Sequence, residues 1–148
     1  MSPIHWRLPE CSQAMFIRVQ GPMYFGAVEY LEKEFRRLEK QRPDQLHLAL
    51  LIDGSVGIDL AGAEWLVEEA RTRKEQGGSL YLVGRYPPLR RQLDQYHVTK
   101  LVGRENIFRR KREMLENMVP KLDPTVCAKC ELRVFLECKN MPSPDAGS

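Results

Sequence analysis

The chain of 148 residues contains no long apolar run. A membrane-spanning helix needs roughly 18 such residues in a row, and a signal peptide needs a basic start before a short apolar core. Neither pattern occurs. The formal net charge is only +3, whereas nucleic-acid-binding domains present a clearly basic face. We therefore expect a soluble, intracellular chain with no membrane span of its own and no affinity for nucleic acid.

Motifs for catalysis are also missing. The histidines, at positions 5, 47 and 97, are isolated, and the chain has no HExxH motif, no nucleophile motif and no glycine-rich phosphate loop. We predict that it is not an enzyme. The 4 cysteines are too few, and too concentrated in the tail, for the disulfide framework of a small secreted protein.

The most informative segment present is 46–65, LHLALLIDGSVGIDLAGAEW. Its unbroken apolar run, Leu48–Ile52, is typical of a strand buried on both faces. Turn residues follow, and then Asp59 stands where a carboxylate caps the start of a helix. We predict a helix from about residue 60 to 76, closed by two glycines. Its apolar stripe, facing the sheet, should consist of Leu60, Ala63, Val67 and Ala70.

Strands and helices alternate along the rest of the chain. The patterns predict strands at 14–20, 23–25, 79–83 and 98–102, and helices at 27–41, from 87 or 88 to about 96, and 108–119. This alternation favours an α/β fold with helices layered on a sheet. We divide the chain into a lead-in segment from a preceding domain (1–12), one domain (13–122) and a cysteine-containing extension (123–148) whose end, from 142, should be disordered.

Five segments together identify a family. In order, they are 21–26 (GPMYFG), 58–64 (IDLAGAE), 77–84 (GGSLYLVG), 103–108 (GRENIF) and 122–138, which begins LDP and contains CAKC and RVFLEC. Their sequences and order resemble the STAS domain of bacterial SulP (sulfate permease) anion transporters. The resemblance implies a STAS fold, also called anti-sigma-factor-antagonist-like, with about four to five strands and helices mainly on one face.

The resemblance also implies a role. Such a domain lies on the cytoplasmic side of the bacterial inner membrane and regulates a transporter of the sulfate or bicarbonate class, whose transport pathway lies in a separate membrane domain. Its implied partners are that membrane domain, a second STAS domain, or a cytosolic protein such as acyl carrier protein. Two alternatives stay open: a freestanding, anti-sigma-factor-antagonist-like binding protein, and a small metal or thiol sensor.

The loop before the second long helix is the predicted partner-binding surface. It comprises Asp53, Ser55, Asp59, Leu60, Ala61, Gly62 and Glu64. In the antagonist branch of the family, the resemblance places a phosphorylated serine or threonine at Ala61, which has no hydroxyl and cannot accept phosphate. Ser55 is a weaker phosphoacceptor candidate, because a serine in such a turn more often hydrogen-bonds the backbone. Asp59 can cap the helix and contact a partner at the same time.

The tail cysteines have three interpretations. The Cys127-x-x-Cys130 spacing suits a zinc site or a redox pair, and Cys138 adds a third thiol. A structural zinc site almost always has four ligands, and the fourth would come from Cys11, His5, His47 or His97. The third interpretation is that the thiols are small buried groups that anchor the tail. We expect no cofactor, and zinc at these cysteines is the single alternative that the spacing leaves open.

Overall fold

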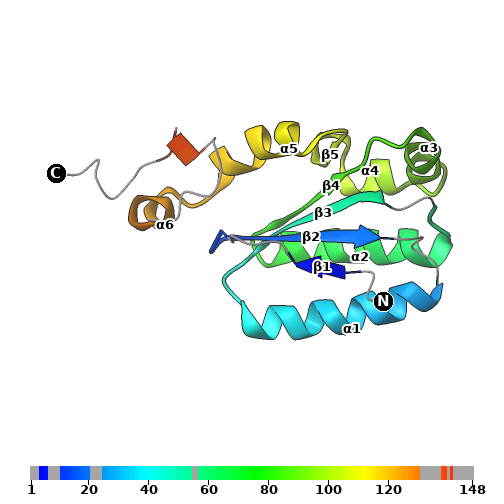
Figure 1. The fold of residues 1–148 in the computed structure, drawn as a ribbon, viewed down its shortest axis with the longest axis horizontal. Coiled ribbons are helices and arrows are strands. Elements are labelled where there is room, and N and C mark those ends of the chain that lie inside the picture. Colours follow the sequence, from blue (N-terminus) through cyan, green and yellow to red (C-terminus); the bar gives the residue numbers. More distant parts are fainter. Residues whose placement is uncertain are drawn as a thin grey trace.

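The computed structural model describes residues 4–6, 11–20, 25–54, 57–130, 138, 139 and 141. Within them lies one five-stranded sheet of order β1-β2-β3-β4-β5 (Figure 1). The strands are β1 (Ile4–Trp6), β2 (Ala14–Gln20), β3 (His47–Gly54), β4 (Ser79–Val83) and β5 (Ile107–Phe108). β1 runs antiparallel to β2, and the other neighbouring pairs are parallel. The predicted α/β fold is confirmed.

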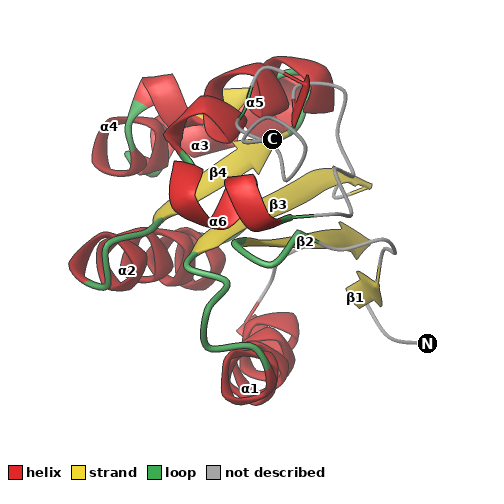
Figure 2. Cartoon of the chain, turned by 90° about the vertical axis from the view of Figure 1, so that its left-hand side faces the viewer, coloured by secondary structure: helices red, strands yellow, loops and turns green. Residues whose placement is uncertain are grey.

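One face of the sheet carries most of the helices. These are α1 (Phe25–Gln41), α2 (Leu60–Glu75), α3 (Pro87–Gln95) and α4 (Val98–Val102). Successive side chains of a strand point to opposite faces, so Leu48, Leu50 and Ile52 of β3 join this core together with buried residues of all four helices. Figure 2 shows α1, α2 and α4 on the same side of the strands. Helices mainly on one face were expected, and the structure confirms this.

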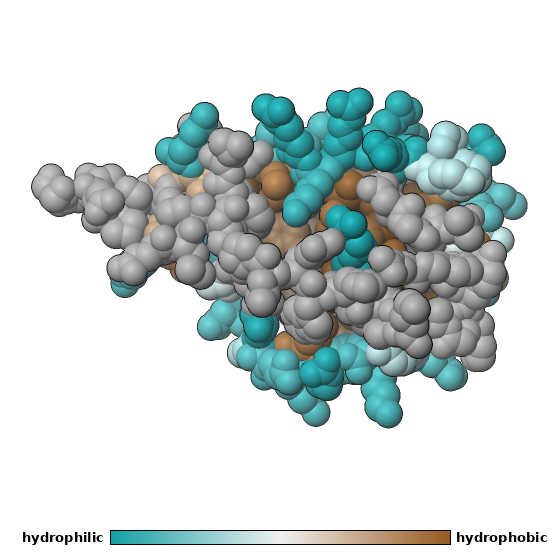
Figure 3. Space-filling model, in the orientation of Figure 1, coloured by the Kyte–Doolittle hydropathy of each residue, from teal (hydrophilic) through white to brown (hydrophobic). Residues whose placement is uncertain are grey.

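The opposite face is covered by the C-terminal part of the chain. Helix α5 (Lys111–Met118), the 3-10 turn η2 (Val119–Lys121) and helix α6 (Pro124–Lys129) follow β5. Ala49 and Leu51, the alternate residues of β3, pack in a second core with Met114 and Met118 of α5. Figure 1 shows α5 on the side of the sheet opposite α1, and Figure 3 shows hydrophilic side chains lining both outer margins of the molecule.

The buried side of α2 differs from the predicted stripe. Ala63 is buried, Val67 and Ala70 are half-buried, and Leu60 is 56% exposed. The side that faces the core instead consists of Gly62, Ala63, Trp65, Leu66, Glu69 and Arg73. Leu60 was therefore wrongly assigned to the core. The helix is rotated from the predicted orientation because Glu69 and Arg73 are buried on its inner side. Charged side chains are rarely buried unless they are paired, and both have partners here.

These partners come from α1 and from the loop that follows it. The Arg73 guanidinium donates to the carbonyl oxygen of Gln45 at 2.8 Å and to Glu39 Oε1 at 3.1 Å. Glu69 accepts a charge-assisted hydrogen bond from Arg36. Arg73 is only 1% exposed, so its charge is retained inside the protein through these bonds. The ion pairs fasten α2 to α1.

Two predicted strands are wrong or only partly described. Residues 98–102, expected as a strand, form helix α4, whose Val98 and Val102 are buried. A short apolar run fits either a buried strand or one side of a helix, and here packing against α2 selects the helix. The true edge strand is β5, after the 3-10 turn η1 (Arg104–Asn106). In the expected strand 23–25, Phe25 begins α1, and residues 23 and 24 lie outside the described part of the chain.

The glycine pair after α2 ends that helix as expected. Gly78 N–H donates to Arg73 O at 2.8 Å and Gly77 N–H to Lys74 O at 3.1 Å, the hydrogen bonds of a Schellman cap. Gly77 has φ +87, and a Cβ on Gly78 would lie 1.9 Å from Leu46 O. One glycine therefore supplies the left-handed conformation, and the other allows close approach of the backbone that leads into β3.

The described residues include no helix that is long and apolar enough to cross a membrane. β1 lies within the lead-in segment 1–12 and pairs with β2 of the domain, and α6 lies within the extension 123–148. The boundaries at 12 and 122 stay a prediction. The expected disordered end, 142–148, is outside the described residues.

Candidate functional site

The predicted partner-binding loop begins at the carboxyl end of β3. Ser55, Val56 and the side chain of Asp53 lie outside the described structure. At the start of α2, Asp59 has extended backbone angles, and its Oδ1 accepts a hydrogen bond from Gly62 N–H at 2.9 Å. Its carbonyl accepts from Ala63 N–H at 2.9 Å. Asp59 is thus the predicted N-cap of α2.

The first turn of α2 is the part of this loop that faces solvent. Leu60 and Glu64 are exposed, and Ala61 is half-buried, whereas Gly62 is buried. An apolar side chain with more than half of its surface in water and an acidic side chain one turn later form a small mixed surface. We call Asp59, Leu60, Ala61 and Glu64 the candidate docking surface. Gly62, also predicted for the partner-binding loop, is buried, and its role there stays a prediction.

A second helix supports this surface. Gln92 of α3 accepts a hydrogen bond at its Oε1 from Ile58 N–H at 2.9 Å. Ile58 is 2% exposed, so this bond holds the backbone just before α2 against α3. Sequence reasoning missed Gln92, because a single polar residue on a helix gives no sign of the loop that it contacts. α3 starts at the same edge of the sheet, next to Tyr86, which is 45% exposed.

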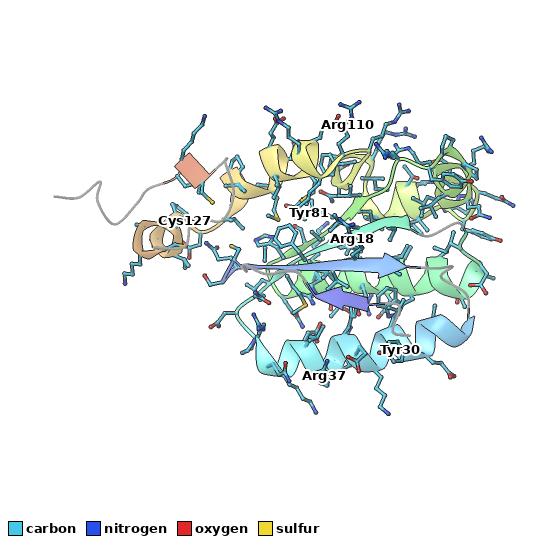
Figure 4. The ribbon with its side chains drawn as sticks, viewed as in Figure 1. Arg18, Tyr30, Arg37, Tyr81, Arg110 and Cys127 are labelled. Carbon is cyan, nitrogen blue, oxygen red and sulfur yellow. The ribbon has the colours of Figure 1, made fainter. Side chains whose placement is uncertain are left out.

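The cysteines lie at the other end of the molecule. Cys127 is on α6, away from α3 along the long axis of the molecule (Figure 4). Cys11 precedes β2 and belongs to the same buried cluster as Cys127 and Cys138. Gln13 links these segments: its Nε2 donates to Asp123 O at 3.2 Å and to Cys127 Sγ at 3.4 Å, and its Oε1 accepts from Asp123 N–H at 2.7 Å. The tail is thereby attached to the beginning of the sheet.

The residues predicted as a fourth zinc ligand lie in different parts of the structure. Cys11 joins the tail thiols, whereas His97 is exposed at the start of α4 and the side chain of His5 is not described. His47 stacks near Tyr81, with ring centroids 6.3 Å apart. Burial lowers the pKa of His47, and repulsion from Arg73 and Lys121 lowers it further. In the described residues, no three His, Cys, Asp or Glu side chains are arranged to hold a metal ion.

Comparison with known proteins identifies the family. A model of the STAS domain matches residues 5–114, most of the chain. The chain belongs to the STAS domain family. The match includes most of β1, all four parallel strands and the start of α2, so these elements are parts of a STAS domain. No curated protein shows significant similarity to the chain.

Solved structures share the fold of this STAS domain. The STAS domain of a SulP transporter from Vibrio cholerae has a TM-score of 0.58 at 20% identity, over 72% of this chain and 80% of that chain. The murine Solute Carrier 26 family member A9 anion transporter has a TM-score of 0.64 at 19% identity, over 74% of this chain and 18% of that chain. A putative anti-sigma factor antagonist from Thermotoga maritima has a TM-score of 0.60 at 15% identity, over 79% and 93%.

Proposed function

We propose that this STAS domain is the cytoplasmic regulatory domain of a bacterial SulP-type transporter for inorganic anions, sulfate or bicarbonate in class. It binds other proteins and catalyses no reaction, and it lies on the cytoplasmic side of the inner membrane. Two findings support the proposal. The chain has the SulP-like segments at 21–26 and 122–138, and its fold is similar to the STAS domain of a SulP transporter and to part of a Solute Carrier 26 anion transporter.

The observation that carries the binding role is the exposed Leu60 on a rigidly capped helix start. Leu60 is 56% exposed, and the Asp59 cap and the Gln92 hydrogen bond hold the adjoining backbone in place. A pre-organised apolar contact loses little conformational entropy on binding. The proposed partner is the membrane domain of the same transporter. A second STAS domain and acyl carrier protein are the further partners that the family resemblance suggests.

A phosphorylation switch at this surface is not part of the proposal. Ala61 stands where the antagonist branch of the family has its phosphoacceptor, and a methyl group forms no phosphate ester. Ser55 stays a candidate, and it lies outside the described residues. The second candidate function is a freestanding antagonist-like binding protein, favoured by the similarity to the putative antagonist from Thermotoga maritima. Such a protein would bind its partner without being regulated by phosphorylation at position 61.

An antibody against this domain tests the proposal in the source cells. We expect one band, much larger than 17.2 kDa, in the membrane fraction. A soluble band near the mass of the chain alone would refute the transporter assignment and favour the freestanding protein.

Uptake of labelled sulfate and bicarbonate then tests the docking surface. We expect Leu60→Asp in the full-length protein to reduce uptake of one of the two anions several-fold. Leu101→Asp is the matched control, because Leu101 is also exposed, at 61%, but lies on α4. Equal uptake by both variants, at equal protein levels in the membrane, would refute the assignment of docking to Leu60.

A further inference from the structure

Three basic segments meet at the edge of the sheet where β4 and β5 end. Gly84, the residue after β4, donates its N–H to the carbonyl oxygen of Phe108, the last residue of β5, at 2.9 Å. The guanidinium of Arg90 on α3 donates to the carbonyl oxygen of Gly84 at 3.2 Å. Arg85 and Arg109 directly follow the two bonded residues. Packing of the strands thus gathers basic residues from three parts of the chain.

No acidic residue lies within these segments. Residues 84–93 and 107–112 contain neither aspartate nor glutamate, although the formal net charge of the whole chain is only +3. Arg90 is half-buried, and the other basic side chains are exposed. We define the basic edge as Arg85, Arg90, Arg91, Arg109, Arg110, Lys111 and Arg112. Neighbouring charges of one sign repel one another, so an anionic partner would stabilise this arrangement.

Partners within the protein offset only part of this charge. Arg112 Nε lies 3.4 Å from Glu116 Oε1, and Lys111 Nζ lies 5.8 Å from the centroid of an aromatic ring on β2. Within the described part of the chain, the side chains of Arg109 and Arg110 form no hydrogen bond or ion pair. Figure 4 shows Arg110 at the outer margin near α5 and β5, and Figure 3 shows hydrophilic side chains projecting along this margin. Both arginines therefore keep their full capacity to bind an external anion.

An exposed aromatic residue lies within the basic edge. Tyr86 follows Arg85, and 45% of its surface is exposed. Tyrosine has an apolar ring and a polar hydroxyl, and it is enriched where membranes meet water. The same helix, α3, holds the backbone before the candidate docking surface through the Gln92 hydrogen bond. The basic edge and the candidate docking surface thus lie at the same edge of the sheet.

We propose that the basic edge binds the anionic headgroups of a phospholipid membrane. Clusters of basic residues next to a membrane bind anionic lipid, and projecting side chains suit a broad surface better than a small molecule, which is usually held in a concave pocket. The inference deepens the proposed function and rests on it, because the membrane in question is the one that holds the transporter. Contact with lipid would orient the candidate docking surface toward the membrane domain.

Binding of the purified 148-residue chain to lipid vesicles tests the inference. One set of vesicles contains phosphatidylglycerol and phosphatidylcholine in equal parts, and the other contains phosphatidylcholine alone. We expect the chain to sediment with the anionic vesicles and to stay in solution with the neutral ones. At about 1 M salt the screening length falls to about 3 Å, so binding to the anionic vesicles should be lost.

Two double variants distinguish the basic edge from net charge. Arg109→Gln with Arg110→Gln should fold, because both side chains are exposed, and should bind anionic vesicles about 30-fold more weakly. The matched control, Lys33→Gln with Lys40→Gln, removes the same charge from exposed positions of α1. Figure 1 shows α1 on the side of the sheet opposite α5. The control should bind the vesicles as tightly as the wild-type chain.

A third variant distinguishes a membrane from an acidic protein. Tyr86→Ala should weaken binding to anionic vesicles, because the ring loses its place between headgroups and acyl chains. Its binding to soluble poly-glutamate, which has no such boundary, should equal that of the wild-type chain. Circular dichroism of each variant checks that the fold is retained.

Three results would overturn the inference. The first is a wild-type chain that does not bind the anionic vesicles. The second is an equal loss of binding in the two double variants, which would mean that only net charge matters. The third is binding to poly-glutamate as tight as binding to vesicles, which would mean that the basic edge fits an acidic protein. Each leaves the proposed function standing, because the antibody experiment tests the transporter assignment separately.

Discussion

Replacing Arg73 by methionine tests whether the buried ion pairs hold α2 against α1. The Arg73 side chain is 1% exposed, and the guanidinium donates to Gln45 O and to Glu39. Burial lowers its pKa, the Glu39 charge opposes that effect, and Arg36 adds to it. Removing one member of a buried ion pair costs about 3–5 kcal/mol because the remaining charge loses its partner.

The loss of stability caused by Arg73→Met should fall at the lower end of that range. Glu69 and Glu39 each keep a hydrogen bond from Arg36, so neither carboxylate is left alone. We therefore expect the free energy of unfolding to fall by about 3 kcal/mol. With a urea m-value of about 2 kcal/mol/M for a domain of this size, the unfolding midpoint should shift by about 1.5 M. The circular dichroism of the folded state should be unchanged.

Lys74→Met is the matched control, because Lys74 is the next residue of the same helix and is exposed. Its effect should stay within about 0.5 kcal/mol. Arg73 also forms a buried ion pair with Glu69, whose Oε2 lies 4.0 Å from Arg73 Nε. The double variant Arg73→Met with Glu69→Leu should therefore be more stable than the sum of the two single changes predicts, because it removes both charges of this pair. A loss below about 1 kcal/mol for Arg73→Met would show that the ion pairs do not stabilise the contact between α1 and α2.

Three further predictions concern caps, glycines and pH. Asp59→Ala should lower the free energy of unfolding by about 1 kcal/mol, measured in urea, because Gly62 N–H loses its acceptor; no loss would mean that water replaces the cap. Gly78→Ala should destabilise the protein more than Gly77→Ala, since only the Gly78 methyl would collide with Leu46 O. The reverse order in thermal melts would contradict the close approach of Gly78 to the backbone of Leu46. The pKa of His47 is lowered in the folded chain, so the unfolded chain binds more protons once the pH falls below about 6.5. The free energy of unfolding should therefore decrease below that pH. In His47→Gln this decrease should be smaller.

Local signals in the sequence were enough for most elements of the fold. Strands β2 and β4 have the predicted bounds, 14–20 and 79–83, and α1 ends at Gln41 as expected, before Pro43. These elements carry strong apolar periodicity and clear stop signals within a few residues. The error at 98–102 arose where neither is present, because five residues with three apolar positions fit both a strand and a helical turn.

At the start of α2, sequence reasoning found the cap but misjudged the orientation of the helix. Asp59 was predicted as the cap from its position alone, since capping depends on contacts within one turn. Leu60 was assigned to the core, although it is exposed. Its orientation depends on Glu69 and Arg73, which are buried because α1 supplies Arg36 and Glu39 from another part of the chain.

The amino-acid sequence by itself determined the family, most of the strands and helices, and the lack of a hydroxyl at Ala61, because each of these depends on residue identity and on patterns a few residues long. Only the tertiary structure decided which side of α2 faces the sheet, that Gln92 supports the loop before it, and that Cys11 lies with the tail cysteines. These three facts depend on contacts between segments far apart in the chain. Such contacts form only when the sheet and both helical layers pack together.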